Sequence, residues 1–185
     1  MRTRFKEEKI LKIRQISKVA ALAAVALAVA VPAMAQEVKP LGLSVRAGLF
    51  LPQSGAGKDQ GKQWFGFGAS YKIKDMEFGT YDRGYASQLD VSLDYYSKGD
   101  LSSMPVLANY VMRQNQIFYS VGAGVSFAKV YDNRPNTKNR MLFAYQLGVG
   151  YDFVQSQTPF FVEAKYFGTT KSELNGFGLY VGARF

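Results

Sequence analysis

The chain of 185 residues contains no histidine and no cysteine. It therefore has no disulfide and no thiolate nucleophile, and it lacks the usual ligands of structural zinc. A serine nucleophile generally needs a histidine-type base, and no Ser–Lys pair of recognisable spacing takes its place. The scattered carboxylates lack the Asp-x-Asp spacing of a calcium loop. The composition predicts a protein that is not an enzyme and that binds no metal and no cofactor.

Long apolar runs are almost absent as well. The one clear run, Val19 to Val31, has 13 residues and is shorter than the ~20 that a spanning helix needs. It follows a stretch, residues 1–18, with a net charge of +5, and it precedes Pro32 and the small-residue sequence Ala33-Met34-Ala35. This layout is typical of a secretory signal peptide. We expect residues 1–35 to form a helical signal peptide that is cleaved after Ala35, which leaves residues 36–185 as one domain.

The basic character of the chain comes largely from this leader. The net charge is +9 for the whole chain and falls to +4 once the +5 of the leader is removed. The remaining charges are scattered, with no basic run of five or more residues. The high pI is therefore no sign of a nucleic-acid partner.

Beyond the leader, apolar and polar residues alternate in eight segments, which indicates strands with one apolar face. Each segment has ~9–11 residues, the length of a tilted strand that crosses a bilayer. In the fourth segment we place Val106, Ala108, Tyr110 and Met112 on the apolar face, although Leu107 and Val111 make the opposite register arguable. The segments are Leu41–Leu51, Trp64–Lys74, Tyr85–Tyr95, about Pro105–Arg113, Ile117–Phe127, Met141–Asp152, Phe160–Phe167 and Phe177–Phe185.

The connections between these segments also differ in kind. Four longer polar connections, at 52–62, 97–103, 129–140 and 168–176, alternate with the shorter 114–116 and 154–159, while 75–84 is long for a turn. Aromatic residues gather near both ends of the apolar faces, with aliphatic residues between them, as in a barrel within a bilayer. These features predict an all-β fold, an eight-stranded antiparallel up-and-down transmembrane β-barrel with four external loops. A soluble periplasmic ligand-binding barrel is the alternative, but it has no reason to sort aromatic residues by depth.

The polar faces of the strands point to the lumen. Eight strands enclose a space about wide enough to be filled by side chains, and charges in such a space are costly unless they are paired. We expect a paired polar network that plugs the lumen; a narrow pore for ions or small solutes is the alternative. The expected members are Arg46, Lys72, Asp90, Asp94, Arg113, Gln146, Glu163, Lys165 and Arg184.

The last segment, Phe177–Phe185, is the most distinctive of the eight. Phe177, Leu179, Val181 and Phe185 lie on one face of a strand that ends on an aromatic residue. This segment resembles the C-terminal strand of bacterial outer-membrane barrels, which is read by the insertion machinery. With the Gly-x-Gly strands Val121–Val125 and Leu147–Tyr151, it makes the whole domain resemble the small eight-stranded outer-membrane barrel family, which includes outer-membrane proteins A and X.

The resemblance implies a monomer in the bacterial outer membrane. Its expected partners are the membrane lipid, the barrel-insertion machinery through the C-terminal strand, and a loop-binding partner that the sequence does not identify. Its expected role is structural or one of surface interaction through the external loops.

Overall fold

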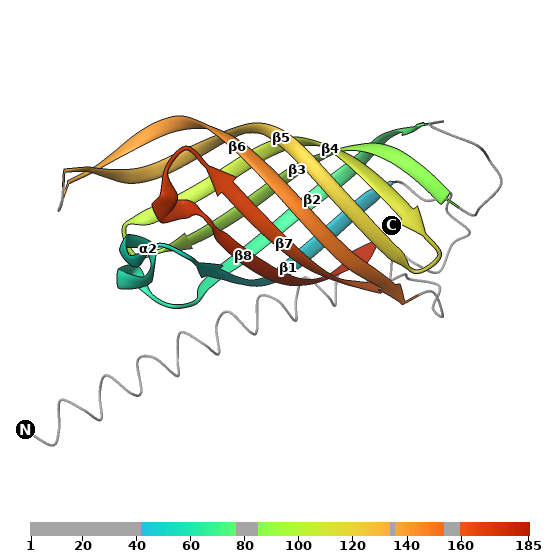
Figure 1. Ribbon diagram of the computed structural model, residues 1–185, viewed down its shortest axis with the longest axis horizontal. Helices are drawn as coiled ribbons and strands as arrows, with labels where there is room; N and C mark the ends of the chain where they lie inside the picture. The colour runs from blue at the N-terminus through green and yellow to red at the C-terminus, as the bar shows by residue number, and fades with distance from the viewer. Residues whose placement is uncertain (1–41, 77–84, 134–135, 154–159) are drawn as a thin grey trace, which may run out of the picture. The chain divides into compact units, whose positions relative to one another are not determined.

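Eight antiparallel strands form one closed barrel in the computed structural model, which describes residues 42–76, 85–133, 136–153 and 160–185 (Figure 1). The strands follow one another in chain order, and β1 pairs with both β2 and β8. The predicted eight-stranded up-and-down barrel is confirmed. The strands are β1 (Leu43–Pro52), β2 (Trp64–Met76), β3 (Tyr85–Lys98), β4 (Leu101–Gln114), β5 (Ile117–Asn133), β6 (Asn136–Phe153), β7 (Phe160–Thr169) and β8 (Gly176–Arg184).

Three expectations concern residues other than these. The signal peptide and its cleavage site lie outside the described residues, as do the connection 154–159 and most of the connection 75–84. No helix within the described ranges is long and apolar enough to cross a membrane.

The alternation of side chains along each strand decides which face is buried. In β4, Leu107, Asn109 and Val111 are buried, whereas Ala108 and Met112 are exposed. The register that we chose for this strand is therefore confirmed, and Leu107 and Val111 face the lumen. The other seven strands alternate in the same sense, since successive residues of a strand point to opposite faces of the sheet.

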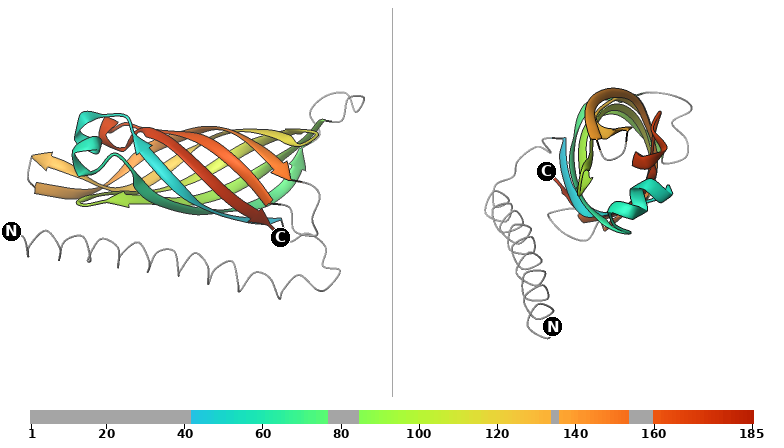
Figure 2. Two further views of the ribbon diagram at one scale, coloured as in Figure 1. Left: turned by 90° about the horizontal axis from the view of Figure 1, so that it is seen from below. Right: turned by 90° about the vertical axis from the view of Figure 1, so that its left-hand side faces the viewer.

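The barrel has two distinct ends (Figure 2). At one, which we call the helical end, lie α2 (Gly55–Gln60), the 3₁₀ helix η2 (Ser172–Leu174) and the tight turn at Gly99. At the other, the turn end, β4 and β5 are joined by Asn115 and Gln116. Asn115 has a φ of 54°, which two-residue hairpin turns require and asparagine tolerates. The predicted polar connections 52–62, 97–103 and 168–176 lie at the helical end, but 97–103 is shorter than expected: β3 continues to Lys98 and β4 begins at Leu101, so only Gly99 and Asp100 join the two strands.

The hairpin of β5 and β6 corrects another of the predicted loops. We expected residues 129–140 to be a polar loop, but β5 continues to Asn133 and β6 begins at Asn136, with Lys129 opposite Asn139 and Val130 opposite Lys138. Cross-strand pairing extends the ladder well beyond the apolar segment. The hairpin therefore projects past the other connections at the helical end (Figure 1).

The C-terminal strand closes the barrel. β8 pairs with β1 from Ser44 opposite Arg184 to Pro52 opposite Gly176, and the backbone N–H of Phe185 donates to the carbonyl of Leu43 at 2.8 Å. Phe177 and Val181 point outward from β8 and are 49% and 61% exposed. The last strand is therefore a structural element on which closure depends.

Gly48 is the tightest point of this closure. A Cβ atom at Gly48 would lie 1.9 Å from the carbonyl oxygen of Leu179 on β8, so Gly48→Ala forces the backbones of β1 and β8 apart. We expect a loss of about 1–3 kcal/mol in unfolding free energy, as for other overpacked sites. Urea unfolding of the refolded barrel in detergent measures it. Gly55→Ala is the control, since nothing lies within 4 Å of a Cβ at Gly55; equal losses in both variants would contradict the prediction.

Candidate functional site

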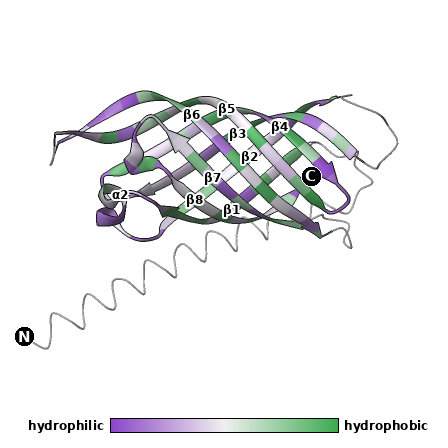
Figure 3. Cartoon of the chain, in the orientation of Figure 1, coloured by the Kyte–Doolittle hydropathy of each residue, from purple (hydrophilic) through white to green (hydrophobic). Residues whose placement is uncertain are grey.

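The outer face of the barrel is apolar, and buried polar and charged side chains occupy much of its lumen, the reverse of a soluble protein. Hydrophobic and hydrophilic residues alternate along the strands (Figure 3). Large apolar side chains on the outer face are exposed, from 37% at Met104 to 68% at Met141. Soluble monomers rarely expose so continuous an apolar surface, whereas a barrel in a bilayer needs one.

Aromatic rings on this outer surface form contacting pairs near the helical end. Tyr166 on β7 and Phe177 on β8 have ring centroids 5.1 Å apart, and Phe67 and Tyr95 are 5.3 Å apart. Aromatic side chains prefer the interface between lipid and water. These rings are therefore placed as an interfacial belt requires.

An ion pair between β1 and β3 lies at the centre of the lumen. Nε and Nη2 of Arg46 donate to Oδ1 and Oδ2 of Asp94 at 2.8 and 2.7 Å, and the two side chains are 2% and 0% exposed. Nζ of Lys165 lies 3.6 Å from Oε1 of Glu163 and 3.9 Å from Oδ2 of Asp94, and Glu163 approaches Arg46 to 4.0 Å. These four residues, which with Gln146 we call the central network, carry two positive and two negative charges and so balance.

A glycine explains how Arg46 and Asp94 meet. β2 lies between β1 and β3, and its Gly68 stands opposite both residues. A Cβ at Gly68 would lie 2.1 Å from Oδ1 of Asp94 and 3.1 Å from Nε of Arg46. The missing side chain therefore leaves the space in which the guanidinium and the carboxylate pair.

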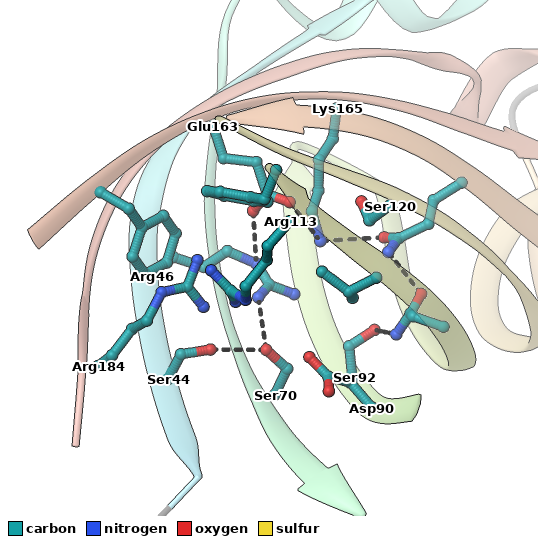
Figure 4. A pocket seen from close by; sticks show the side chains of 15 residues that line it. Ser44, Arg46, Ser70, Asp90, Ser92, Arg113, Ser120, Glu163, Lys165 and Arg184 are labelled. Carbon is teal, nitrogen blue, oxygen red and sulfur yellow. Dashed lines mark hydrogen bonds and ion pairs between the residues drawn. The ribbon is translucent and has the colours of Figure 1, made fainter. Parts of the chain in front are cut away.

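The same arrangement recurs three strands further around the barrel, on β4, β5 and β6. Gly122 of β5 stands opposite both Asn109 and Gln146, and Nε2 of Gln146 donates to Oδ1 of Asn109 at 2.5 Å. Gln146 also accepts from Nζ of Lys165 at 3.0 Å, and Asn109 donates to Oγ of Ser92 at 2.9 Å (Figure 4). A continuous hydrogen-bonded chain thus crosses the lumen from the central network to β3.

A second charged group closes the lumen at the turn end. Asp152 pairs with Nη1 of Arg113 at 2.5 Å and with Nη2 of Arg184 at 3.0 Å. The guanidinium of Arg184 also lies over the rings of Phe118 and Phe161, 4.7 and 4.4 Å from their centroids. A cation over an aromatic face is stabilised by the ring quadrupole. We call these five residues the turn-end cluster.

The lumen near the helical end has a different content. It holds an aromatic layer, in which the rings of Phe50 and Tyr96 stack at 4.1 Å and Trp64 lies 5.3 Å from Phe50. Its members are 0–1% exposed. They are Phe50, Trp64, Tyr96, Leu101, Val130, Phe167 and Leu174. The polar network expected from the sequence therefore does not extend to this end, where mostly apolar side chains fill the lumen.

Loop residues complete the closure of the helical end. Leu174 of η2 is fully buried, and its carbonyl accepts from the hydroxyl of Tyr96 at 3.1 Å. Gln60 of α2 accepts from the backbone N–H of Asp100 at 3.1 Å and donates to the hydroxyl of Tyr131 at 2.5 Å. The loops are thus bonded to the barrel and to one another.

The predicted lumen residues divide into three groups. Arg46, Asp94, Glu163, Lys165 and Gln146 come together in the central network, while Arg113 and Arg184 belong to the turn-end cluster. Lys72 does not join either group, because its Nζ pairs with Asp75 at 3.2 Å where both side chains are more than a third exposed. Asp90 accepts from Nε2 of Gln88 at 2.6 Å. The sequence analysis did not include Asp152, the partner of Arg113 and Arg184, or Asn109, the partner of Gln146, although both occupy inward positions of their strands.

Little space remains between these layers. The cavity among Ser44, Arg46, Ser120, Glu163 and Arg184 holds about 20 Å³ (Figure 4), enough for about one water molecule. Oγ of Ser120 is buried and has no hydrogen-bond partner within the part of the chain that the structure describes. No group of three acidic residues that could hold a metal ion occurs among the described residues. Side chains therefore fill the lumen around this cavity.

Two solved outer-membrane proteins are similar to the chain. One is the outer membrane protein Ail of Yersinia pestis in a phospholipid bilayer nanodisc, with 17% identity, a TM-score of 0.45 and coverage of 77% of this chain and 98% of Ail. The other is the outer membrane enzyme PagL, with 16% identity, a TM-score of 0.43 and coverage of 75% and 97%. No protein-family model matches the chain, and no curated protein matches it.

Proposed function

We propose that this chain is a closed, non-enzymatic barrel of the bacterial outer membrane, and that it acts through the surface of its helical end. The apolar exterior supports the location, because a barrel with a continuous apolar outer face needs lipid around it. In a closed barrel every strand also has a hydrogen-bonded neighbour on both sides, which is the condition for crossing a bilayer with strands.

The filled lumen is the observation that carries the proposal. Three layers lie one after another along the axis: the aromatic layer, the central network and the turn-end cluster. The cavity between the last two holds about 20 Å³. A hydrated ion would have to displace paired charges and packed rings to pass, so the closed state is the stable one.

The absence of enzymatic activity rests on chemistry and access. The chain has no histidine or cysteine to act as base or nucleophile. Ser120, Glu163 and Lys165, which line the cavity of the lumen, are buried. A substrate would have to enter the closed barrel to reach them.

The helical end is the surface that remains for an interaction, and we place it outside the cell. Its connections are hydrogen-bonded to one another: the backbone N–H of Gln53 donates to the carbonyl of Asn175 at 2.9 Å, and Oδ1 of Asn175 accepts from the N–H of Thr169 at 2.7 Å. A surface ordered before binding loses less conformational entropy when a partner docks. This order supports a role in recognition.

Fractionation and conductance test the proposal together. We expect the chain to fractionate with the outer membrane, to migrate faster on gels when unheated than when heated, and to give no steady current in planar bilayers. Recovery in the soluble periplasm would contradict the membrane assignment and support a soluble ligand-binding barrel. A steady open current that substitution of Arg46 or Glu163 abolishes would contradict the closed lumen and support a narrow pore.

A further inference from the structure

β6 has a long open edge at the helical end. It pairs with β5 as far as Asn136, but its pairing with β7 begins only at Ala144, opposite Thr169. Residues Asn136–Phe143, which we call the β6 edge, therefore have a strand neighbour on one side only among the described residues. Eight residues span about 26 Å. The projecting hairpin that carries this edge is seen in two views (Figures 1 and 2).

An open edge of this kind presents backbone hydrogen-bonding groups. In an antiparallel strand, alternate residues direct their N–H and C=O groups to opposite sides. The groups on the open side of the β6 edge can pair with another strand, and long edges without proline are templates for such pairing. The β6 edge contains no proline, and Leu142 is its only buried residue.

The side chains of the edge fall on two chemically different faces. Lys138 and Arg140 lie on the face that continues the lumen side of the sheet, and both are exposed. Met141 and Phe143 lie on the other face, where they are 68% and 56% exposed. Cations thus line one face and large apolar groups the other.

The charge around the edge is positive. Arg140 pairs with Asp132 of β5 at 2.6 Å, which leaves Lys138 and Lys129 as an excess of two positive charges on the described part of the hairpin. Across the described residues of the helical end, seven lysines and arginines face four acidic residues. They are Lys58, Lys62, Lys98, Lys129, Lys138, Arg140 and Lys171 against Asp59, Asp100, Asp132 and Glu173. Acidic partners are favoured here and basic ones are not.

The same charges disfavour a second copy of this chain. If two β6 edges paired about a two-fold axis, residues on one face would meet their own counterparts. In a register centred on Asn139, Lys138 of each copy lies opposite Arg140 of the other. In a register centred on Arg140, the two Arg140 side chains lie opposite each other. Like charges opposite one another in a ladder are destabilising.

We propose that the β6 edge binds an extended segment of another protein, which adds to the sheet as a further antiparallel strand and carries acidic side chains opposite Lys138 and Arg140. The backbone pairing supplies affinity and the alternating carboxylates supply selectivity. This proposal rests on the proposed function in one respect, namely that the helical end faces outward.

A designed peptide is the probe. It has nine residues with blocked ends, with glutamate at alternate positions and threonine or valine between them. Mature barrel in phospholipid nanodiscs is mixed with this peptide, and backbone amide hydrogen exchange is followed along β6. We expect slower exchange at alternate residues between Thr137 and Phe143. Two comparison peptides, one with lysine for glutamate and one with a central proline, are expected to leave exchange unchanged.

Matched charge reversals separate the edge from the general charge of the helical end. The double variant Lys138→Glu, Arg140→Glu is expected to bind the acidic peptide about tenfold more weakly or worse. The double variant Lys58→Glu, Lys62→Glu changes the net charge by the same amount in α2 and just after it, and is expected to bind as the parent does. Heat-modifiable gel migration checks that both variants remain folded.

Each remaining outcome decides against the proposal. Unchanged exchange at Thr137–Phe143, or equal protection by the proline peptide, would exclude strand addition. If both charge variants bound the acidic peptide equally well, the binding would be non-specific attraction to the charge of the helical end. Protection of the edge that grows with barrel concentration and needs no peptide would identify a second copy as the occupant. A barrel that fractionates with the outer membrane and stays closed in any of these cases leaves the proposed function standing.

Discussion

Replacing Asp94 with alanine is expected to lower the unfolding free energy of the barrel by about 3–5 kcal/mol. The substitution leaves the buried guanidinium of Arg46 without either of its bonds to carboxylate, at 2.8 and 2.7 Å. The central network then holds two positive charges and one negative charge among side chains that are almost fully buried. An uncompensated buried charge costs far more than the loss of a surface ion pair. Urea unfolding in lipid or detergent measures the change.

Two further variants show whether charge balance is the cause. Asp75→Asn breaks the exposed pair with Lys72 and is expected to change stability little, because exposed ion pairs contribute little. Arg46→Met combined with Asp94→Leu removes one charge of each sign, so Glu163 and Lys165 remain balanced. We expect this double variant to recover most of the stability lost in Asp94→Ala. If it is less stable than Asp94→Ala, charge balance is not what the central network provides.

The sequence predicts which side chains of a strand point into the lumen. It does not predict which of them lie at the same height along the barrel axis and so meet. Alternation assigned Arg46, Asp94 and Asp152 to the inner face, because the period of two is visible in a single chain. Which inner residues lie at the same height depends on the stagger between strands, which the hydrogen-bond register sets and one sequence does not contain. Arg46 and Asp94 are 48 positions apart and meet because Gly68 lies opposite both.

Glycines on the inner face leave space for side chains of neighbouring strands. Which side chains use that space can be predicted only when the register is known. Gly68 and Gly122 each separate two side chains that bond across the gap. Gly150 instead makes room for the ring of Phe118, because a Cβ atom added at Gly150 would lie 2.2 Å from Cζ of that ring. A glycine on the inner face therefore marks space that a side chain of a neighbouring strand fills, and the register then identifies that side chain.

The aromatic layer was not predicted from the sequence for a different reason. Phe50, Trp64, Tyr96 and Phe167 all occupy inner positions. Phe50, Trp64 and Phe167 lie within predicted segments, so alternation points them to the lumen, whereas Tyr96 lies one residue past the predicted segment Tyr85–Tyr95. They were overlooked because a polar lumen was expected, and an aromatic residue in a membrane barrel is readily assigned to the lipid interface. Their position at the helical end, beneath α2 and η2, gives them a core like that of a soluble protein.

Replacing Trp64 with alanine is expected to cost about 3–5 kcal/mol of unfolding free energy. Trp64 is fully buried, contacts the rings of Phe50 and Tyr96, and donates from Nε1 to the carbonyl of Gly61 at 2.9 Å. Its removal leaves a cavity in the aromatic layer and an unpaired carbonyl in the loop that follows α2. The unfolding midpoint in urea should fall accordingly.

Phe65 is the matched control, because it follows Trp64 directly and points outward, 41% exposed. Phe65→Ala is expected to cost clearly less, since lipid or detergent can occupy the space that the ring leaves. Trp64→Ala should also remain non-conducting in planar bilayers, because the central network and the turn-end cluster still fill the lumen. Equal destabilisation by the two variants would show that the aromatic layer is not a packed core. A current through Trp64→Ala alone would show that this layer, and not the charged groups, keeps the barrel closed.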